Sequence, residues 1–479
     1  MLRQIVRSVL VALAIAVPAR AAPDADGLAR VYVEAINSAD PAAVERFQAQ
    51  MTPEFAASVP LPVLIDYFAD QRRISGGGVD LVGARVRPGA APTLEVALRN
   101  RVYGGVQGAT LPLVGDKAPR FSNLDLVPAP AWVPASGPPL SQGQFAARVA
   151  ELADRGCAAG VFSGAVLLAA GDKVLATHAC GEASRRYRVA NTPDTRFNLG
   201  SMDKMFTAVA AAQLIETGKL DPAATIDRYL DAGWIDPAVA RRVTVWQLMT
   251  HTSGLEPDFL TAMKDKARTG FRELADYKPL TRLAHTTFEP GTKYEYSNTG
   301  VLILGAVVAS ASGEDYFAYV RDHVFRPAGM TASGAFAADD PEPGLAVGYY
   351  RAQGSAYGWR ENTLDFPLRG SPAGGGYATV GDLHRFLRAV QTGRLVSPAS
   401  RAKLWTRAAG GDYGAGFETV DGAVGRTVGH SGFYKGISTK ARIYLDRGYI
   451  AVVLSNIDRG AVPLLDAIEG EMLRAPKAD

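Results

Sequence analysis

Hydrophobic residues recur at helical spacing over residues 205–215, directly after a polar turn, and Gly218 ends the run. The pattern predicts a buried helix that begins at Ser201. Lys204 then lies one turn along the helix on the same face as Ser201. A serine and a lysine are therefore expected side by side at the N-terminus of an apolar helix.

Residues 24–126 carry a different pattern, in which helical segments come first and strand-like runs follow. The helical segments are 24–39, 41–51 and 62–73, and the strand-like runs are 78–86, 93–103, 109–114 and 121–127. Turn residues separate the strand-like runs. Helices followed by an antiparallel sheet predict a small α+β unit.

A proline-rich connector, residues 127–140, follows this unit and is expected to act as a semi-rigid linker. Ser141 to Gln144 then offers a capping box for a helix that ends near Gly156. Further elements are the hairpin strands 161–169 and 173–179, the final strands 427–429, 438–445 and 449–454, and a closing helix over 462–473. The pattern predicts an α/β unit assembled from both ends of residues 141–479, with a helical lobe at roughly 200–400 inserted between them.

The beginning of the chain predicts export. Arg3 and Arg7 precede a short apolar run, residues 9–17, and an Ala-x-Ala site then indicates cleavage after Ala21. The run is too short to span a bilayer, so we expect a periplasmic or secreted protein without a stable membrane anchor. The net charge is +3 with no long run of one sign, which gives no reason to expect a nucleic-acid partner.

The two cysteines allow two alternatives. An exported protein permits a disulfide between Cys157 and Cys180. Pairing across the predicted hairpin, however, places Cys180 opposite roughly residue 163, about half a dozen positions from Cys157. We therefore favour two buried free thiols slightly over a disulfide.

Ser201 and Lys204 form a chemically useful pair. A lysine amine one turn from a serine can take the hydroxyl proton when burial lowers its pKa. The unpaired N–H groups at the helix N-terminus favour a developing oxyanion. Most Ser-x-x-Lys tetrads are surface residues of helices, so the pair gains its meaning from two further motifs.

These motifs are Tyr296-x-Asn298 and His430-x-Gly432, which follow Ser201-x-x-Lys204 in this order. Together the three resemble the serine β-lactamase-related superfamily, which includes class C β-lactamases, D-alanyl-D-alanine carboxypeptidases, D-aminopeptidases and esterases. Residues 248–255, 288–300 and 374–383 resemble the same family, and the likeness covers about 141–473. It implies a β-lactamase/transpeptidase-like αβα sandwich with an antiparallel sheet and a helical lobe. The order of elements over residues 24–126 resembles NTF2-like (SnoaL-type) domains, which are cone-shaped.

The family resemblance implies roles for the motif residues. Ser201 is the expected nucleophile, and Lys204 and Tyr296 are expected to share its proton. Asn298 is expected to hold Lys204 and the substrate amide. The backbone N–H groups of Ser201 and Phe433 are the expected oxyanion hole.

The third motif, His430-Ser431-Gly432, departs from the Lys-Thr-Gly of β-lactamases. Histidine is mostly neutral at pH 7, so His430 is expected to attract a substrate carboxylate less than lysine does. Gly432 leaves room for the ligand beside the backbone. Two nearby residues are expected to be uninvolved in the chemistry: His251 is expected to hold a turn, and Asp203 to point away from the nucleophile.

We therefore predict an exported serine hydrolase that acts on a small-molecule or peptide ester or amide, of the esterase or D-alanyl carboxypeptidase/D-aminopeptidase type. The alternatives are a true β-lactamase and a non-catalytic ligand-binding or penicillin-sensing protein. The histidines of the chain show no metal-ligand spacing, so no metal or cofactor is expected. Nothing in the sequence indicates an oligomeric state.

Overall fold

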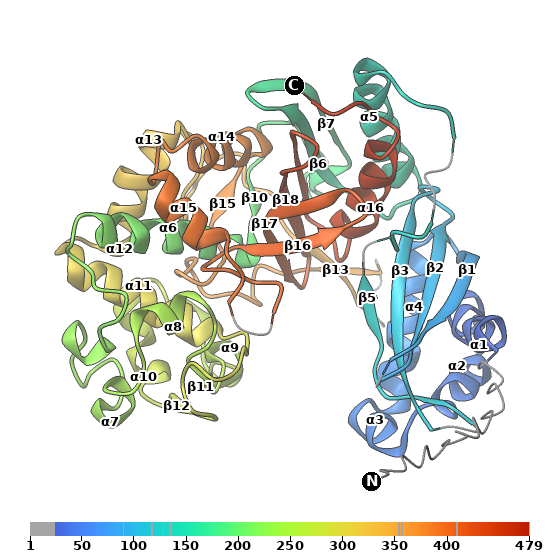
Figure 1. Cartoon of the computed structure of the whole chain (residues 1–479). Helices are drawn as coiled ribbons and strands as arrows, with labels where there is room; N and C mark the ends of the chain where they lie inside the picture. Colours follow the sequence, from blue (N-terminus) through green and yellow to red (C-terminus); the bar gives the residue numbers. More distant parts are fainter. Residues whose placement is uncertain are drawn as a thin grey trace, which may run out of the picture.

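The computed structural model describes residues 24–89, 91–115, 118–127, 129–133, 137–352, 355, 358–408 and 411–478. The predicted signal sequence, residues 1–21, lies outside the described residues. Figure 1 shows a helical lobe and an α+β unit on opposite sides of a central sheet. This arrangement places the predicted nucleophile helix against the sheet.

The central sheet joins strands from both ends of residues 141–479, as predicted. It has the antiparallel order β16-β17-β18-β19-β6-β7. The strands are β6 (Gly164–Ala170), β7 (Lys173–Cys180), β16 (Glu418–Gly422), β17 (Gly425–Tyr434), β18 (Ile437–Tyr444) and β19 (Tyr449–Ser455). Strand β19 pairs with β6, with Val453 opposite Val166, and this pairing closes the two ends into one sheet.

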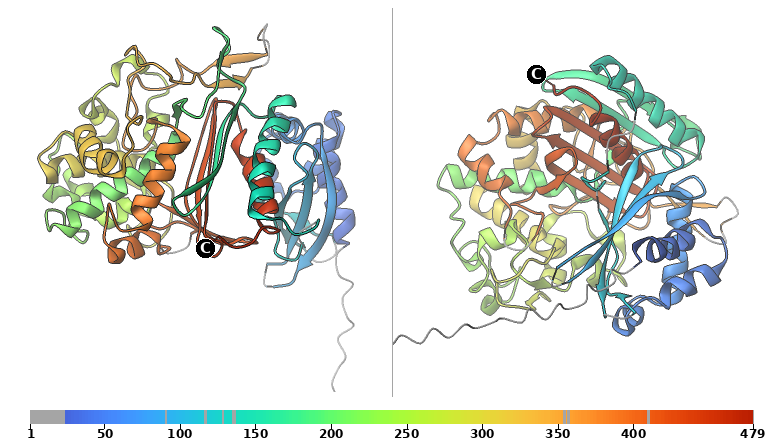
Figure 2. Two further views of the ribbon diagram at one scale, coloured as in Figure 1. Left: turned by 90° about the horizontal axis from the view of Figure 1, so that it is seen from above. Right: turned by 45° about the vertical axis from the view of Figure 1, so that its right-hand side comes forward.

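Helices cover both faces of this sheet, so the predicted αβα sandwich is confirmed (Figure 2, left). Helices α5 (Gln142–Ala158) and α16 (Ala461–Met472) pack on one face, with Phe145 and Leu464 in their core. Helix α5 has the predicted capping box between Ser141 and Gln144. On the opposite face, α6 (Asp203–Glu216) and α14 (Val380–Gln391) belong to the larger core.

The helical lobe between β7 and β16 consists of short elements around two long helices, α6 and α11 (Asn298–Ser312). The other helices are α7 (Pro237–Ala240), α8 (Val245–Met249), α9 (Phe259–Ala262), α10 (Lys278–Thr281), α12 (Tyr316–Tyr319), α13 (Arg326–Ala328) and α15 (Pro398–Trp405). The short strands of this region are β8 (Glu182–Ser184), β9 (Val189–Ala190), β10 (Phe197–Asn198), β11 (Leu255–Glu256), β12 (His285–Thr286), β13 (Tyr349–Arg351), β14 (Trp359–Glu361) and β15 (Tyr377–Ala378).

No single helix among the described residues is long and apolar enough to cross a membrane. Only the bent pair formed by α11 and the segment 316–328 passes such a test together, and the two parts meet at 81°. Most of α11 is buried in the larger core.

The N-terminal unit has the predicted order of helices before strands. Its elements are α1 (Ala25–Asn37), α2 (Pro41–Gln48), α3 (Pro53–Ser58), α4 (Leu61–Ile74), β1 (Val79–Arg87), β2 (Thr93–Asn100), β3 (Val106–Val114), β4 (Arg120–Phe121) and β5 (Asp125–Val127). Helix α3 was not predicted, and the run expected as one strand over 121–127 forms the two short strands β4 and β5, which both pair with β3. The resemblance of this unit to NTF2-like domains stays a prediction.

The N-terminal unit shares a core with the sandwich. Val102 and Tyr103, from the turn after β2, are buried in the core beneath α5 and α16. An ion pair is a second contact between the two units: the Nε atom of Arg459 lies 3.3 Å from the Asp70 carboxylate of α4. The two units are therefore joined by apolar packing and by an ion pair.

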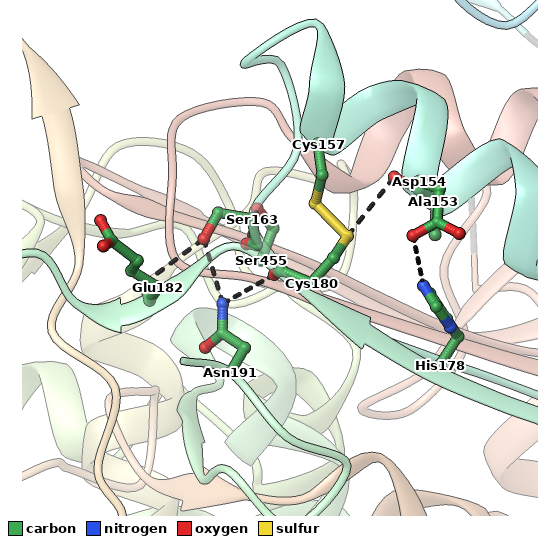
Figure 3. The surroundings of a disulfide bond; sticks show 9 residues. All are labelled: Ala153, Asp154, Cys157, Ser163, His178, Cys180, Glu182, Asn191 and Ser455. Atoms are coloured by element: carbon green, nitrogen blue, oxygen red, sulfur yellow. Dashed lines mark hydrogen bonds and ion pairs between the residues drawn. A yellow bond between two sulfur atoms is a disulfide. The ribbon is translucent and has the colours of Figure 1, made fainter. Parts of the chain in front are cut away.

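Cys157 and Cys180 form a disulfide, so the preference for free thiols was wrong (Figure 3). In the hairpin, Cys180 pairs with Gly164, close to the position expected. Cys157, however, belongs to the last turn of α5, and α5 packs across β7. The bond therefore joins a helix to a strand instead of two positions of one hairpin.

Candidate active site

The nucleophile turn is a short 3₁₀ turn, Gly200–Met202, that runs into α6. Gly200 has the left-handed φ of +54°, and a Cβ there would lie 3.1 Å from the Cα of Gly432. Gly432 has no room for a side chain either, because its Cβ would lie 1.9 Å from the Leu199 carbonyl oxygen. The two glycines let the backbone of the turn touch strand β17 directly.

A glycine-rich turn holds the nucleophile turn from its other side. Gly375 N donates to the Gly200 carbonyl at 3.1 Å, and Leu199 N donates to the Gly376 carbonyl at 2.8 Å. The Asp203 carboxylate accepts a hydrogen bond from Gly376 N at 2.5 Å. Burial raises the pKa of Asp203 to about 7, against the lowering effect of this hydrogen bond. Asp203 thus braces the turn, and its carboxylate is committed to Gly376.

Lys204 is 1% exposed and points at Ser201. Its Nζ atom lies 3.1 Å from Ser201 Oγ, 2.7 Å from Asn298 Oδ1 and 2.5 Å from the Ala373 carbonyl oxygen. Burial lowers the pKa of Lys204 to about 7, and the negative charge of Asp258 opposes this shift. A large share of the lysine is therefore a neutral amine near neutral pH.

Asn298 connects Lys204 to a carboxylate. Its Oδ1 accepts from Lys204, and its Nδ2 donates to Asp258 Oδ2 at 2.7 Å. The other oxygen of Asp258 accepts from Leu260 N and caps α9. Asp258 therefore fixes the orientation of the Asn298 amide and helps to keep the lysine beside Ser201.

Tyr296 lies over Lys204, whose Nζ is 4.9 Å from the centre of the tyrosine ring. The side chain of Tyr296 is partly exposed to the pocket. Burial nevertheless raises the pKa of Tyr296 above the ordinary value, and a hydrogen bond with Ser201 opposes this rise. The phenol is therefore protonated at neutral pH. The buried ring of His251 lies 4.3 Å from that of Tyr296, and its Nδ1 accepts from Ser297 N, so His251 holds the tyrosine motif in place.

His430 is buried in β17 and neutral. Its Nδ1 lies 2.6 Å from the Ser431 carbonyl oxygen, so Nδ1 carries the proton and Nε2 accepts from the Tyr413 hydroxyl at 3.0 Å. Burial lowers the pKa of His430 to about 4, against the effect of the nearby Glu418. Both ring nitrogens are therefore engaged within the protein.

Ser431 turns toward Glu418 instead of Ser201. Its backbone N and its Oγ each donate to the Glu418 carboxylate at 3.0 Å, and Arg442 pairs with the same carboxylate. Burial alone would raise the pKa of Glu418, but the charge and the hydrogen bond of Arg442 more than offset it, and the pKa falls to about 2. Glu418 is therefore ionised, and its charge is already matched.

The predicted oxyanion residues adjoin the nucleophile. A Cβ on Gly200 would lie 3.2 Å from Phe433 N, which places the backbone of Phe433 next to the turn that carries Ser201. The Thr439 hydroxyl donates to the Leu199 carbonyl at 2.9 Å and fixes this contact between β18 and the turn. The side chain of Phe433 is 59% exposed and forms part of the pocket rim.

A pocket of about 500 Å³ opens beside Ser201. The structure brings Ser201, Tyr296 and Asn298 to its wall together with the three residues His430, Ser431 and Phe433 of β17; Lys204 lies behind them and Gly432 supports the turn. Sequence reasoning missed Asp258, Ala373, Tyr413 and Glu418, which belong to segments without a recognisable motif.

The described residues contain one cluster of side chains with metal-ligating atoms, Asp154, His178 and Cys180. It lies at the junction of α5 and β7 (Figure 3). The sulfur of Cys180 is bonded to Cys157, so it is not available as a thiolate ligand.

Known proteins of related sequence include penicillin-binding proteins and an esterase. The family described as beta-lactamase matches residues 145–472. Penicillin-binding protein 4* of Bacillus subtilis is 30% identical over 317 residues, which cover 62% of this chain and 68% of that protein. Esterase EstB of Burkholderia gladioli is 32% identical over 253 residues, which cover 50% of this chain and 62% of the esterase.

A solved structure shares the fold. The penicillin-binding protein from Bacillus halodurans is 33% identical with a TM-score of 0.59, and the match covers 64% of this chain and 96% of that one. The family match spans the sheet, the helical lobe and all three motifs around Ser201. The chain therefore belongs to the beta-lactamase family of serine hydrolases.

Proposed function

We propose that this protein is a serine hydrolase that cleaves an ester or amide bond through an acyl-enzyme on Ser201. The observation that carries the proposal is the buried Lys204 amine, 3.1 Å from Ser201 Oγ and with a pKa of about 7. A neutral amine at this distance can accept the serine proton. A protein that binds its ligand without covalent attachment has no need for such a base.

The first step joins Ser201 Oγ to the substrate carbonyl carbon while the hydroxyl proton moves to Lys204 Nζ. Negative charge then develops on the carbonyl oxygen, and the backbone N–H groups of Ser201 and Phe433 are the proposed donors to it. Collapse of the intermediate breaks the bond to the leaving group. The leaving group takes a proton from the Tyr296 hydroxyl, which Lys204 reprotonates.

Water completes the reaction by attacking the acyl carbon. The same groups then transfer protons in the opposite direction. Lys204 accepts a proton from the water, and Ser201 Oγ leaves with a proton. This division of labour differs from the sequence-based expectation, in which Lys204 and Tyr296 share the proton and Tyr296 also serves as a base. The raised pKa of Tyr296 makes the phenol a proton donor in the resting site, and the lowered pKa of Lys204 makes the amine the acceptor.

We also propose that the protein acts in the periplasm or outside the cell, after cleavage near Ala21. The export pattern of residues 3–21 and the Cys157–Cys180 disulfide support this location, because structural disulfides persist mainly in oxidising compartments.

A fluorophosphonate probe tests whether Ser201 is a nucleophile. Wild-type protein should be labelled covalently, and Ser201→Ala should lose the label. Lys204→Ala should label at least about 100-fold more slowly while its circular dichroism spectrum stays that of the wild type. Equal labelling of wild type and Ser201→Ala, or no labelling of the wild type, would contradict the proposal.

The same protein preparation also tests two alternative functions with β-lactams. A true β-lactamase should turn over nitrocefin, whereas a penicillin-sensing protein should acquire a long-lived penicilloyl adduct without turnover. We favour an esterase or peptidase, because the third motif presents the neutral His430 where β-lactamases have a lysine.

A further inference from the structure

The wall of the pocket beside Ser201 is mainly apolar. Its aromatic and aliphatic side chains include Phe259, Leu260, Phe336, Leu345, Phe366 and Leu368. A volume of about 500 Å³ with such a lining suits a medium-sized hydrophobic group. The pocket therefore favours a substrate with an apolar acyl or alcohol part.

The described residues that line the pocket also offer no available positive charge. Of the described residues that line it, Arg369 is the only arginine or lysine. Its guanidinium stacks 3.8 Å from the ring centre of Phe317, and its Nε donates to the Ala335 carbonyl at 2.7 Å. Glu273 lies 3.4 Å from the same guanidinium. Arg369 is thus engaged outside the pocket.

Three further basic side chains beside the pocket are committed as well. Lys204 has three partners and lies behind the nucleophile. Arg442 is only 7% exposed and pairs with Glu418. His430 has both nitrogens engaged and is neutral at physiological pH. None of these groups is free to pair with an anionic substrate.

Glu418 lines the pocket and is ionised, and its pairing with Arg442 leaves neither charge available to a ligand. A carboxylate of the substrate would lose its water and find no unmatched cation. Both effects disfavour its binding.

Building on the proposed function, we infer that the substrate of this site is a neutral, apolar ester or amide without a carboxylate near the bond that is cleaved. Peptides with a free C-terminal carboxylate next to that bond, and β-lactams with a carboxylate on the fused ring, are therefore poor substrates. The inference concerns the same Ser201 site and assigns the chemical class of what it accepts.

A pair of esters of equal shape tests the inference. One is p-nitrophenyl 6-methylheptanoate, and the other is the p-nitrophenyl monoester of adipic acid, in which a carboxylate replaces the terminal isopropyl group. At pH 8, with the rate in buffer subtracted, kcat/KM should be about 100-fold higher for the neutral ester. Equal values, or a preference for the adipate ester, would overturn the inference.

A positive charge introduced into the wall of the pocket gives a second test. The backbone of Leu368 is held on both sides, by Arg268 and Ala338, while its side chain lines the pocket. Leu368→Lys should raise the adipate-to-neutral ratio of kcat/KM by about 10-fold relative to Leu368→Met, the uncharged control. An unchanged ratio, in a variant that still reacts with fluorophosphonate, would contradict the assignment.

The outcomes distinguish this inference from the proposed function. Fluorophosphonate labelling of Ser201 together with a preference for the adipate ester, or with no turnover of either ester, overturns the substrate class alone. Absence of labelling overturns the proposed function and with it the substrate class. Labelling together with selective turnover of the neutral ester supports both.

Discussion

At the scale of single residues, the chemistry of the site depends on the protonation state of Lys204. Burial lowers its pKa, whereas the carboxylates of Asp258, Asp203 and Glu418 each raise it. Burial has the larger effect, and the balance leaves the amine with a pKa of about 7. The carboxylate with the largest raising effect, Asp258, is connected to Lys204 through the Asn298 amide.

The pH dependence of acylation should report this balance. The neutral amine becomes more abundant as the pH rises through about 7, so kcat/KM for a neutral ester should rise from pH 6 to pH 8 and then level off. Asp258→Asn removes a negative charge that stabilises the ammonium. Its profile should shift to lower pH by up to about one unit, with a lower plateau because Asn298 loses an acceptor.

The control for this prediction is Asp265→Asn, which changes an exposed aspartate of the same lobe. Its pH profile should match that of the wild type. A wild-type profile without a limb near pH 7, or a shift of the Asp258→Asn profile to higher pH, would show that Lys204 is not the base.

How far the sequence predicted the site also depends on single residues. Ser201, Lys204 and Tyr296 stand in short motifs whose spacing is visible along the chain. Asp258 and Glu418 reach the site only through tertiary packing, and their surroundings in the sequence resemble those of ordinary loop and strand residues. No local pattern distinguishes a carboxylate that tunes a lysine from one that faces solvent.

At the scale of elements, the predicted bounds of helices and strands were accurate where the hydrophobic periodicity was strong. They were wrong where glycines interrupt that periodicity. The predicted helix at Ser201 begins two residues later as α6, because Gly200 adopts a left-handed conformation and the first turn is 3₁₀. Strand β17 extends well beyond the predicted 427–429. Pairing with β18 keeps it extended through Gly429 and Gly432, which have low strand propensity, and β16 pairs with it as far as Gly429.

The disulfide illustrates a second limit of predicting elements and their contacts from the sequence. The expected register of the hairpin was nearly correct, but the partner of Cys180 comes from helix α5, which crosses the strand. Packing of a helix on a strand brings positions together that hairpin geometry alone keeps apart. Such a contact can be inferred from a sequence only after the sandwich has been assembled.

At the scale of the whole molecule, the N-terminal unit reaches the rim of the active site. Arg459 lies 3.3 Å from Asp70 of α4, 6.0 Å from the ring centre of Tyr67 and 5.5 Å from that of Phe433. Phe433 belongs to the pocket rim, so Arg459 connects Asp70 of the N-terminal unit to the wall of the pocket beside Ser201. No pattern in the sequence indicates this junction, because its residues are far apart along the chain.

Loss of the Asp70 charge should therefore affect binding of large substrates. In Asp70→Asn, Arg459 is less firmly held over Phe433, and KM for the 6-methylheptanoate ester should rise about two- to fivefold. The rate of fluorophosphonate labelling should not change, because the small probe does not depend on the rim. Glu34→Gln, which breaks the Glu34–Arg46 ion pair of the same unit, is the matched control. Identical KM values for the two variants would contradict this coupling.

The central claim is that Ser201 carries the acyl group of the substrate. Wild-type protein is mixed in excess with p-nitrophenyl 6-methylheptanoate, quenched with acid within milliseconds, and its mass is measured intact and after digestion. We predict an adduct of one 6-methylheptanoyl group on the peptide that contains Ser201, and no adduct and no hydrolysis with Ser201→Ala. Hydrolysis at an undiminished rate by Ser201→Ala, or an adduct on another residue of the wild type, would contradict the claim.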